Sequence, residues 1–174
     1  RIPETPMAIE QTLIFIKPDG LVKSLTGNIL SRLSEARLQI IGAKVVRVTR
    51  ELAERHYAHL KGKPFFEEMI DFILGNKHNT HRVVAFVYQG EDAIRRIRDI
   101  VGETNPEEAN PVSIRGAYGR ITTKGVFENV VHASSSVEDA EQEIKLWFRP
   151  DEIVLDIYPT VTTVRERVEI REWA

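Results

Sequence analysis

The stretch NVVHASSSVEDAEQEI, residues 129–144, decides how this chain is expected to fold. A short apolar run leads to a single histidine, His132, and a loop of small residues separates it from a helical pattern. Apolar residues recur through that pattern at the spacing of one buried helix face, at Val137, Ala140, Ile144, Trp147 and Phe148. A strand that leads directly into an amphipathic helix is typical of sheets covered by helices.

Carboxylates lie close to this histidine on the predicted helix. Glu141 and Glu143 flank the apolar face on opposite sides, so either could point back toward His132. A carboxylate bound to one imidazole nitrogen fixes the tautomer and leaves the other nitrogen free as a base or nucleophile. The spacing does not choose between the two glutamates, and a histidine that only packs at a strand end remains the alternative. The helix start is also open, because Ser135 and Ser136 both fit a capping box.

The rest of the chain alternates between strand-like and helical segments. Apolar or β-branched runs predict strands at residues 12–16, 39–49 and 83–88. Helices are expected at residues 26–36 with Thr26 as the cap, 51–57, 64–74 with Pro64 in the first turn, and 92–100. Turns or loops are expected at residues 17–20, 75–82 and 102–123. This alternation predicts an α/β or α+β sandwich, with helices on one or both faces of a small sheet.

The composition is that of one globular domain, with 174 residues of which 42% are hydrophobic and 29% charged. A net charge of −2 gives no general attraction to nucleic acid, so a polyanion must be held by a local cluster of cations. The lack of cysteine excludes disulfides, thiolate metal ligands and a cysteine nucleophile. No apolar run reaches the roughly 20 residues of a membrane helix, and RIPETPMAIE does not resemble a signal peptide. A cytoplasmic location and no membrane partner are therefore expected.

Several cations and donors lie on turns or near helix ends. The chain has no G-x-x-x-x-G-K-[ST] loop and no G-x-G-x-x-G turn, so phosphates cannot be held in either of those ways. Lys17, Arg98 and Arg115, together with the hydroxyl of Thr104, could converge on a polyphosphate and neutralise transition-state charge. The alternative is an ordinary Lys-Pro-Asp-Gly turn and a solvated face of arginines.

Six motifs extend the argument from single residues to a family. They are IKPDG at 16–20, HYAHLKGKPFF at 56–66, GETNP at 102–106, SIRG at 113–116, NVVHAS at 129–134 and SVEDAEQEIKLWF at 136–148. Over residues 10–150 the chain resembles the nucleoside diphosphate kinases, in which these motifs occur in this order. The resemblance implies a ferredoxin-like sandwich, a four-stranded antiparallel sheet with helices packed on it. It also implies an N-terminal arm at 1–9, a tail at 151–174 that packs on the domain or a neighbouring subunit, and a homo-oligomer, hexameric or tetrameric.

The resemblance assigns the chemistry to the residues around His132. His132 would take the terminal phosphoryl group of ATP or another nucleoside triphosphate and pass it to a nucleoside diphosphate, a ping-pong reaction that maintains nucleotide pools. Glu143, rather than Glu141, matches the carboxylate that orients the imidazole. Ser134 matches the hydroxyl beside it, and Tyr57 lies near the histidine in the family.

The remaining matched residues would bind the nucleotide. Phosphate ligands are matched by Arg98, Thr104 and Arg115, and His59 occupies a position that approaches the phosphates. Lys17 and Asn129 match residues that contact the ribose and its 3′-hydroxyl, and Phe65 matches the aromatic on which the base stacks. Mg²⁺ would be held mainly by the nucleotide phosphates, with no metal site made by the protein alone.

The chain departs from the family pattern at four places. Where the family usually reads HGSDS, this chain has Ala133 for glycine and Ser135 for aspartate. Residues 75–82 and 116–128 form longer segments than usual, and the second is expected at a subunit interface or over the nucleotide cleft.

Two other classes of function are weighed against this one. A catalytically silent member that binds nucleotides or partners as a regulatory module would be favoured by a substituted histidine or phosphate arginine, and none is seen. A metal site could use the pairs His56-x-x-His59 or His78-x-x-His81, although no third ligand has an obvious spacing. The composition gives no support to a DNA-binding role.

Overall fold

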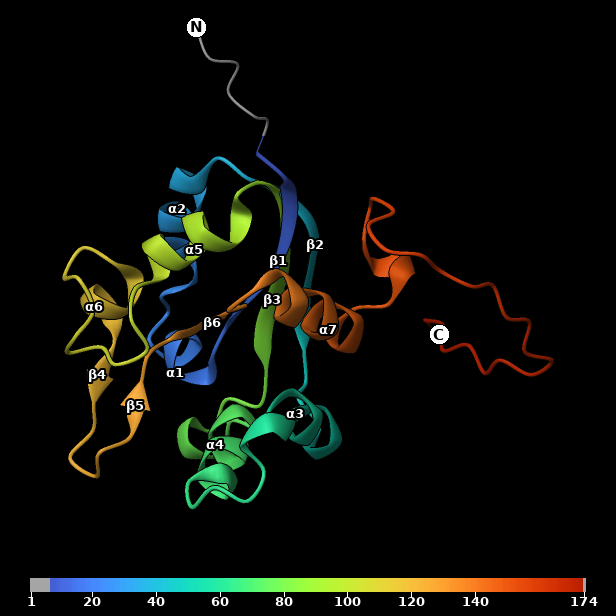
Figure 1. Cartoon of the computed structure of the whole chain (residues 1–174). Coiled ribbons are helices and arrows are strands. Elements are labelled where there is room, and N and C mark those ends of the chain that lie inside the picture. Colours follow the sequence, from blue (N-terminus) through green and yellow to red (C-terminus); the bar gives the residue numbers. More distant parts are fainter. Residues whose placement is uncertain (1–6, 174) are drawn as a thin grey trace, which may run out of the picture.

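Four apolar segments form one antiparallel sheet in the computed structural model, which describes residues 7–173 (Figure 1). The strands are β1 (Ile9–Ile16), β2 (Gln39–Val46), β3 (Val83–Glu91) and β6 (Val131–Ala133), in the order β2-β3-β1-β6. β1 lies in the middle and pairs with β3 on one side and with β6 on the other. The predicted ferredoxin-like α+β sandwich is confirmed.

Helices cover both faces of this sheet. Side chains of β1 alternate between two cores, Leu13 and Phe15 in one and Ile14 and Ile16 in the other, and all four are fully buried. The first core also contains residues of α3 (Arg50–His56), α4 (Phe66–Ile73) and α7 (Val137–Trp147). The second contains residues of α2 (Thr26–Leu33) and α5 (Ala93–Val101), on the opposite side of the sheet in Figure 1. Burial on both faces explains the unbroken apolar run of β1.

Several predicted boundaries near helix starts are wrong. The Lys-Pro-Asp-Gly segment enters a short helix, α1 (Pro18–Val22), because proline at a first helical position sacrifices no hydrogen bond. Thr26 makes no capping hydrogen bond and is the first residue of α2. α4 begins two residues after Pro64. The turn-rich region contains a further helix, α6 (Ile114–Tyr118), whose start is capped by the Ser113 hydroxyl.

The helix after His132 has a defined start. The Ser136 hydroxyl accepts a hydrogen bond from the Asp139 amide at 3.1 Å, so Ser136 and not Ser135 is the cap of α7. Ala140, Ile144 and Trp147 are buried as predicted. Val137 is 47% exposed, so its place in the buried stripe is wrong, because the first helical residue lies beyond the turns that cover the sheet.

Both of the longer segments carry local structure. Residues 75–82 contain a 3₁₀ turn, η3 (Asn76–His78). Residues 116–128 include a hairpin of β4 (Arg120–Ile121) and β5 (Phe127–Glu128), whose loop contains Gly125 at a positive φ of 77°. Further 3₁₀ turns are η1 (Ser34–Ala36), η2 (Ala58–Leu60) and η4 (Pro150–Glu152).

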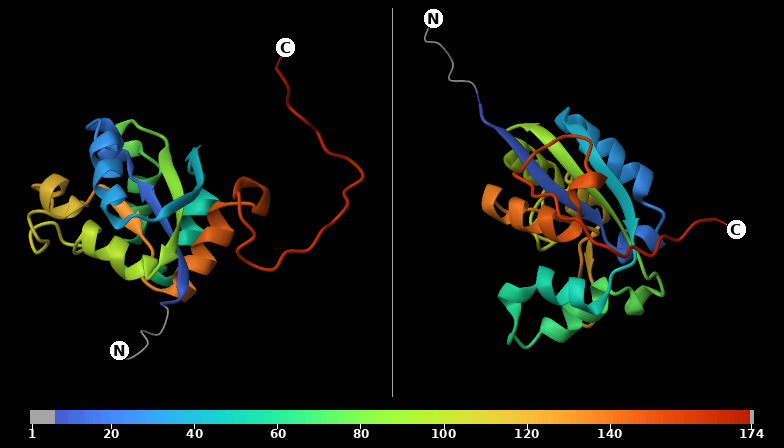
Figure 2. Two further views of the ribbon diagram at one scale, coloured as in Figure 1. Left: turned by 90° about the horizontal axis from the view of Figure 1, so that it is seen from above. Right: turned by 90° about the vertical axis from the view of Figure 1, so that its right-hand side faces the viewer.

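The two ends of the chain differ in how they contact the domain. The predicted arm at 1–9 lies partly outside the described residues, and Ile9 already pairs with Glu91 in β1. After α7, the Val154 amide donates to the Ile41 carbonyl at 2.9 Å, and Tyr158 packs against the first core. Beyond residue 160 the chain leaves the domain, as the left view of Figure 2 shows, and Trp173 is fully exposed. Within residues 7–173 no helix has the length and apolarity needed to cross a bilayer.

Candidate active site

His132 lies in the middle of β6, opposite Phe15 of β1. Its ring stacks on Phe15 with the centroids 4.7 Å apart, and the ring of His56 meets it edge-on at 4.6 Å. Contacts on two sides hold the imidazole plane in one orientation. The sheet therefore places the histidine as part of a strand, and its side chain remains 18% exposed toward the site.

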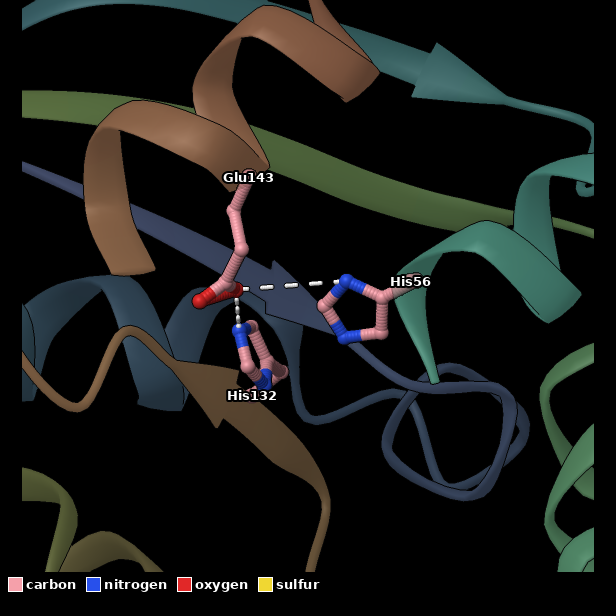
Figure 3. A group of neighbouring side chains, drawn as sticks. All are labelled: His56, His132 and Glu143. Atoms are coloured by element: carbon pink, nitrogen blue, oxygen red, sulfur yellow. Dashed lines mark hydrogen bonds and ion pairs between the residues drawn. The ribbon is translucent and has the colours of Figure 1, made fainter. Parts of the chain in front are cut away.

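Glu143 is the carboxylate that reaches this histidine (Figure 3). Its Oε2 shares a hydrogen bond with Nε2 of His132, which leaves Nδ1 as the nitrogen without a carboxylate partner. Glu141 lies two residues earlier on α7, on the other side of the buried stripe. It pairs with Lys145 at the surface at 2.6 Å. Residue spacing alone did not show which glutamate reaches His132. The orientation of α7 directs Glu143 to the histidine and Glu141 to the surface.

Electrostatics favour a neutral imidazole. Burial, together with the charges of Lys17 and Arg115, holds the pKa of His132 well below its usual range. Burial also raises the pKa of Glu143 to about 7. A neutral His132 with its Nε2 proton directed at Glu143 presents an unprotonated Nδ1, the form that can act as a nucleophile.

His56 is a buried member of the site that sequence reasoning considered only as half of a metal pair. The Trp147 indole N–H donates to its Nδ1 at 3.1 Å, which places the His56 proton on Nε2. Burial and the neighbouring His132 lower the pKa of His56 to about 2, so this ring stays neutral. No periodic signal marks His56 in the sequence, because its contacts come from elements distant in the chain.

A metal ion does not fit this cluster well. Donor atoms of His56, His132 and Glu143 all lie within 4.8 Å of one another. However, the His56 nitrogen nearest to Glu143, at 3.9 Å, already accepts from Trp147, and the other two residues bind each other. The candidate pair His78 and His81 is engaged elsewhere, since His78 binds Glu128 and His81 binds the Leu74 carbonyl.

Ser134 and Tyr57 are buried beside the site. The fully buried Ser134 hydroxyl accepts from the Leu13 amide at 3.0 Å and ties the end of β6 to β1. Tyr57 ends α3, and the edge of its ring meets His56 at a centroid distance of 4.7 Å. Burial raises the pKa of Tyr57, so its hydroxyl stays protonated and can donate a hydrogen bond.

Three of the predicted nucleotide ligands are linked to each other. The Lys17 ammonium donates to Asn129 Oδ1 at 2.7 Å, and the Asn129 amide donates to the Thr104 carbonyl at 2.9 Å. Burial and the charge of Arg115 lower the pKa of Lys17 to about 8. A buried lysine whose pKa is lowered by a neighbouring arginine marks a concentration of positive charge that favours an anion.

Arg115 is buried beside β6. It donates to the Gly102 carbonyl at 3.1 Å and to the Val131 carbonyl at 2.9 Å, while its Nε has no partner within residues 7–173. Burial and the charge of Arg98 lower the pKa of Arg115 to about 10. Arg98, in the last turn of α5, is exposed, and its charge also acts on His132.

A strained residue lies between Asn129 and His132. Val130 has a φ of 62°, which is rare for a β-branched residue and is sustained by its surroundings. Its amide donates to Oδ2 of the buried Asp19 at 3.0 Å, and its carbonyl accepts from the Lys17 amide at 2.8 Å. Sequence reasoning missed this role of Asp19, because Lys-Pro-Asp-Gly was interpreted as a turn.

A cavity of about 550 Å³ adjoins these polar residues. Five predicted residues line it: Lys17, Tyr57, Phe65, Thr104 and Asn129. Its apolar walls come from α4 and the preceding turn on one side and from the β4–β5 hairpin on the other, through Leu60, Met69, Phe72, Val126 and Phe127. His59 is exposed and does not line it, because η2 directs the next residue, Leu60, inward.

Known proteins share both the sequence and the fold. A family profile described as "Nucleoside diphosphate kinase" matches residues 10–153. The nucleoside diphosphate kinase of Pyrococcus furiosus is 46% identical over 145 residues, which are 83% of this chain and 86% of that protein.

Solved structures agree with this match. The Aquifex aeolicus nucleoside diphosphate kinase superposes with a TM-score of 0.74 and 42% identity, over 84% of this chain and 99% of that one. A transition-state mimic of the Borrelia burgdorferi nucleoside-diphosphate kinase, with bound vanadate and ADP, gives a TM-score of 0.75 and 31% identity. That match covers 87% of this chain and 93% of the other.

Proposed function

We propose, given that this chain belongs to the nucleoside diphosphate kinase family, that His132 carries the transferred phosphoryl group and that Glu143 positions it. The chain transfers the terminal phosphate of a nucleoside triphosphate to a nucleoside diphosphate by a ping-pong mechanism. Its general role is to maintain the pools of (deoxy)nucleoside triphosphates. The observation that supports the assignment is the His132–Glu143 hydrogen bond, which occupies Nε2 and leaves Nδ1 free.

In the first half-reaction the Nδ1 lone pair of His132 forms a bond to the γ-phosphorus. The bond from that phosphorus to the β,γ-bridging oxygen breaks, and the nucleoside diphosphate leaves with the electron pair. As the N–P bond forms, positive charge develops on the imidazole, and the Glu143 carboxylate at Nε2 stabilises it. A second diphosphate then attacks the phosphohistidine in the reverse sense, so one site serves donor and acceptor in turn.

The remaining predicted residues are assigned to substrate binding. Arg98 and Arg115, with Thr104, neutralise the oxygens of the transferring phosphoryl group, a role supported by the crowding of positive charge around Arg115. Lys17 and Asn129 bind the ribose and its 3′-hydroxyl at the polar end of the cavity. Phe65, 46% exposed at the apolar end, provides the stacking surface for the base. His59 is exposed and does not line the cavity, but its charge acts on His132, so we keep it, like the exposed Arg98, as a residue that approaches the phosphates.

Kinases of this kind use a divalent cation, and we propose Mg²⁺ bound mainly through the nucleotide phosphates. Glu143 binds His132, and Asp19 binds the Val130 amide through Oδ2 while its buried Oδ1 has no partner within residues 7–173. The group of three potential ligand side chains among the described residues is His56, His132 and Glu143, so we assign the ion to the nucleotide phosphates and not to a cage of carboxylates. The cation supplies charge neutralisation across the β- and γ-phosphates. Lys17, Arg98 and Arg115 place their positive charge beside the same phosphates.

We also propose a cytoplasmic homo-oligomer, hexameric or tetrameric, acting on ATP and other nucleoside tri- and diphosphates. β2 is an edge strand on which Ile40 and Val45 are 49% and 64% exposed, and an apolar edge of this kind is suited to a subunit contact. The absence of cysteine fits a reducing compartment. Light scattering coupled to size exclusion measures the subunit number.

The central test is a labelling experiment with radioactive ATP and magnesium. We expect an acid-labile, alkali-stable phosphoenzyme that disappears when a nucleoside diphosphate is added. A chain that binds ATP and never becomes labelled would be a catalytically silent member, and the proposed chemistry would be wrong.

A further inference from the structure

The two segments that are longer than the family pattern meet at one buried carboxylate, Glu128. This residue ends β5 and is 4% exposed. Its Oε1 binds Nε2 of His78 at 2.6 Å, and its Oε2 binds the Arg120 guanidinium. Lys23, just after α1, lies 3.7 Å from Oε2. Glu128 is therefore the shared partner of one side chain from its own hairpin, Arg120, and of two from other segments, His78 and Lys23.

Each of the two main partners belongs to a different wall of the 550 Å³ cavity. His78 ends η3, the 3₁₀ turn that follows α4. Its ring meets the ring of Phe72 edge-on, with the centroids 5.2 Å apart, and Phe72 lines the cavity. Arg120 lies opposite Glu128 in the β4–β5 hairpin, which contributes Phe127 to the other wall. Nδ1 of His78 is buried without a partner in residues 7–173, so Glu128 is the polar contact that holds this ring.

The charge on Glu128 makes this link strong. Burial alone would raise the pKa of this carboxyl, but hydrogen bonds from Arg120 and His78 and the charge of Lys23 lower it to about 2. Glu128 is thus ionised across the physiological range. A buried charge with several donors holds its partners in place, because the loss of a partner would leave a buried negative charge without compensation.

We infer that Glu128 is a positioning residue that sets the distance between the two walls of the base-binding cleft: Arg120 holds it within the hairpin wall, and from there it binds His78 behind the opposite wall. The inference rests on the proposed function, since it takes this cavity as the site of the base. Asn129, the next residue, is held separately by Lys17 and Thr104. Loss of the link should therefore affect how the base is bound and leave the reaction at His132 intact.

The test compares phosphoenzyme discharge by an acceptor with a base and one without. Phosphoenzyme prepared with labelled ATP is mixed with subsaturating ADP or ribose 5-diphosphate, and the rate of label loss gives kcat/KM for each. In Glu128→Gln and His78→Gln we expect kcat/KM for ADP to fall about tenfold, ~1.4 kcal/mol, because the base is bound less well. Discharge by ribose 5-diphosphate should stay within about twofold of the wild type.

A double variant and a matched control complete the design. If the two residues act through one link, Glu128→Gln combined with His78→Gln should lose little more than either alone. Glu152→Gln is the control, because Glu152 pairs with Lys44 and Arg149, which lie outside the cavity lining. It should leave both acceptors unchanged, and melting temperatures of all variants report any general loss of stability.

The outcomes separate this inference from the proposed function. Equal losses for ADP and ribose 5-diphosphate, additive losses in the double variant, or unchanged discharge by ADP would each overturn the role of Glu128. Absence of any phosphoenzyme in the wild type would overturn the proposed chemistry instead. Because His78→Gln keeps the Arg120–Glu128 pair, it provides the answer if Glu128→Gln fails to fold.

Discussion

Replacing Glu143 by glutamine isolates the contribution of one charge to phosphoryl transfer. Glutamine has the size of glutamate and can still accept a hydrogen bond from Nε2 of His132. What it cannot do is stabilise the positive charge that develops on the imidazole as the N–P bond forms. Glu143→Gln should therefore slow phosphoenzyme formation while ATP still binds.

The size of the effect follows from the hydrogen bond and the charge. A hydrogen bond to a charged group contributes ~1.5–3 kcal/mol, compared with ~0.5–1.5 kcal/mol for a neutral one. Two unit charges about 4 Å apart at an effective dielectric constant of about 20 attract by roughly 4 kcal/mol, an upper limit for the charge that develops. At 1.36 kcal/mol for each tenfold, the loss should be on the order of 10²-fold.

Rapid quench with labelled ATP measures this rate in a single turnover. Glu141→Gln is the matched control, because Glu141 lies on the same helix and pairs with Lys145 at the surface. It should react within about twofold of the wild type. Equal, small losses in the two variants would refute the role assigned to Glu143.

The pH profile provides an independent readout. Since the pKa of Glu143 is raised to about 7, its carboxylate becomes protonated as the pH falls through that value, and the wild-type rate should fall with it. The pKa of His132 lies well below its usual range, so the imidazole stays neutral over the same interval. Glu143→Gln should lose the fall in rate near pH 7, because the carboxyl that titrates there is gone, whereas any change near pH 8 from Lys17 should be the same in both enzymes.

Three further outcomes are expected. His132→Ala should bind ADP by calorimetry and acquire no label from ATP; robust exchange by this variant would exclude a phosphohistidine at 132. Shortening the hairpin within residues 116–128 should weaken ADP binding or change the assembly size in light scattering. A variant unaltered in both would show that the segment contributes neither to nucleotide binding nor to assembly. Because Phe65 offers every base a stacking surface, the kcat/KM values of ADP, GDP, CDP, UDP and their deoxy forms should span roughly 10–200-fold, whereas a preference near 10⁴-fold would require a hydrogen-bonding base pocket.

Much of the fold could be predicted because its signals are local. The run 12–16 and the stripe Ala140, Ile144 and Trp147 show their burial in the sequence itself, and the structure buries them. Helix starts were less predictable, since threonine suits both a cap and a first turn, and proline is tolerated in turns as well as in a first helical turn. Helical spacing alone could not choose between Glu141 and Glu143, because both flank the buried stripe. The family resemblance favoured Glu143, and the orientation of α7 places that carboxylate on His132.

The interior of the site was hidden for a different reason. The position of His56 depends on Trp147 and His132, which lie far from it in the sequence and meet only in the folded core. His59 and Leu60 are neighbours, and only the 3₁₀ geometry of η2 decides that Leu60 faces the cavity. Contacts of this kind have no period along the chain, so no spacing argument can reveal them.

The substitution of alanine for the usual glycine at 133 illustrates how backbone geometry decides what a site tolerates. A left-handed backbone at this position would penalise alanine, but Ala133 pairs with Ile14 within β6 and is absent from the residues with positive φ. The left-handed residue of this segment is Val130, three positions earlier, and the Asp19 carboxylate and the Lys17 amide hold it there. The left-handed backbone that precedes His132 is at Val130, where the buried Asp19 carboxylate stabilises it. Position 133 therefore does not require a glycine, and alanine is tolerated there.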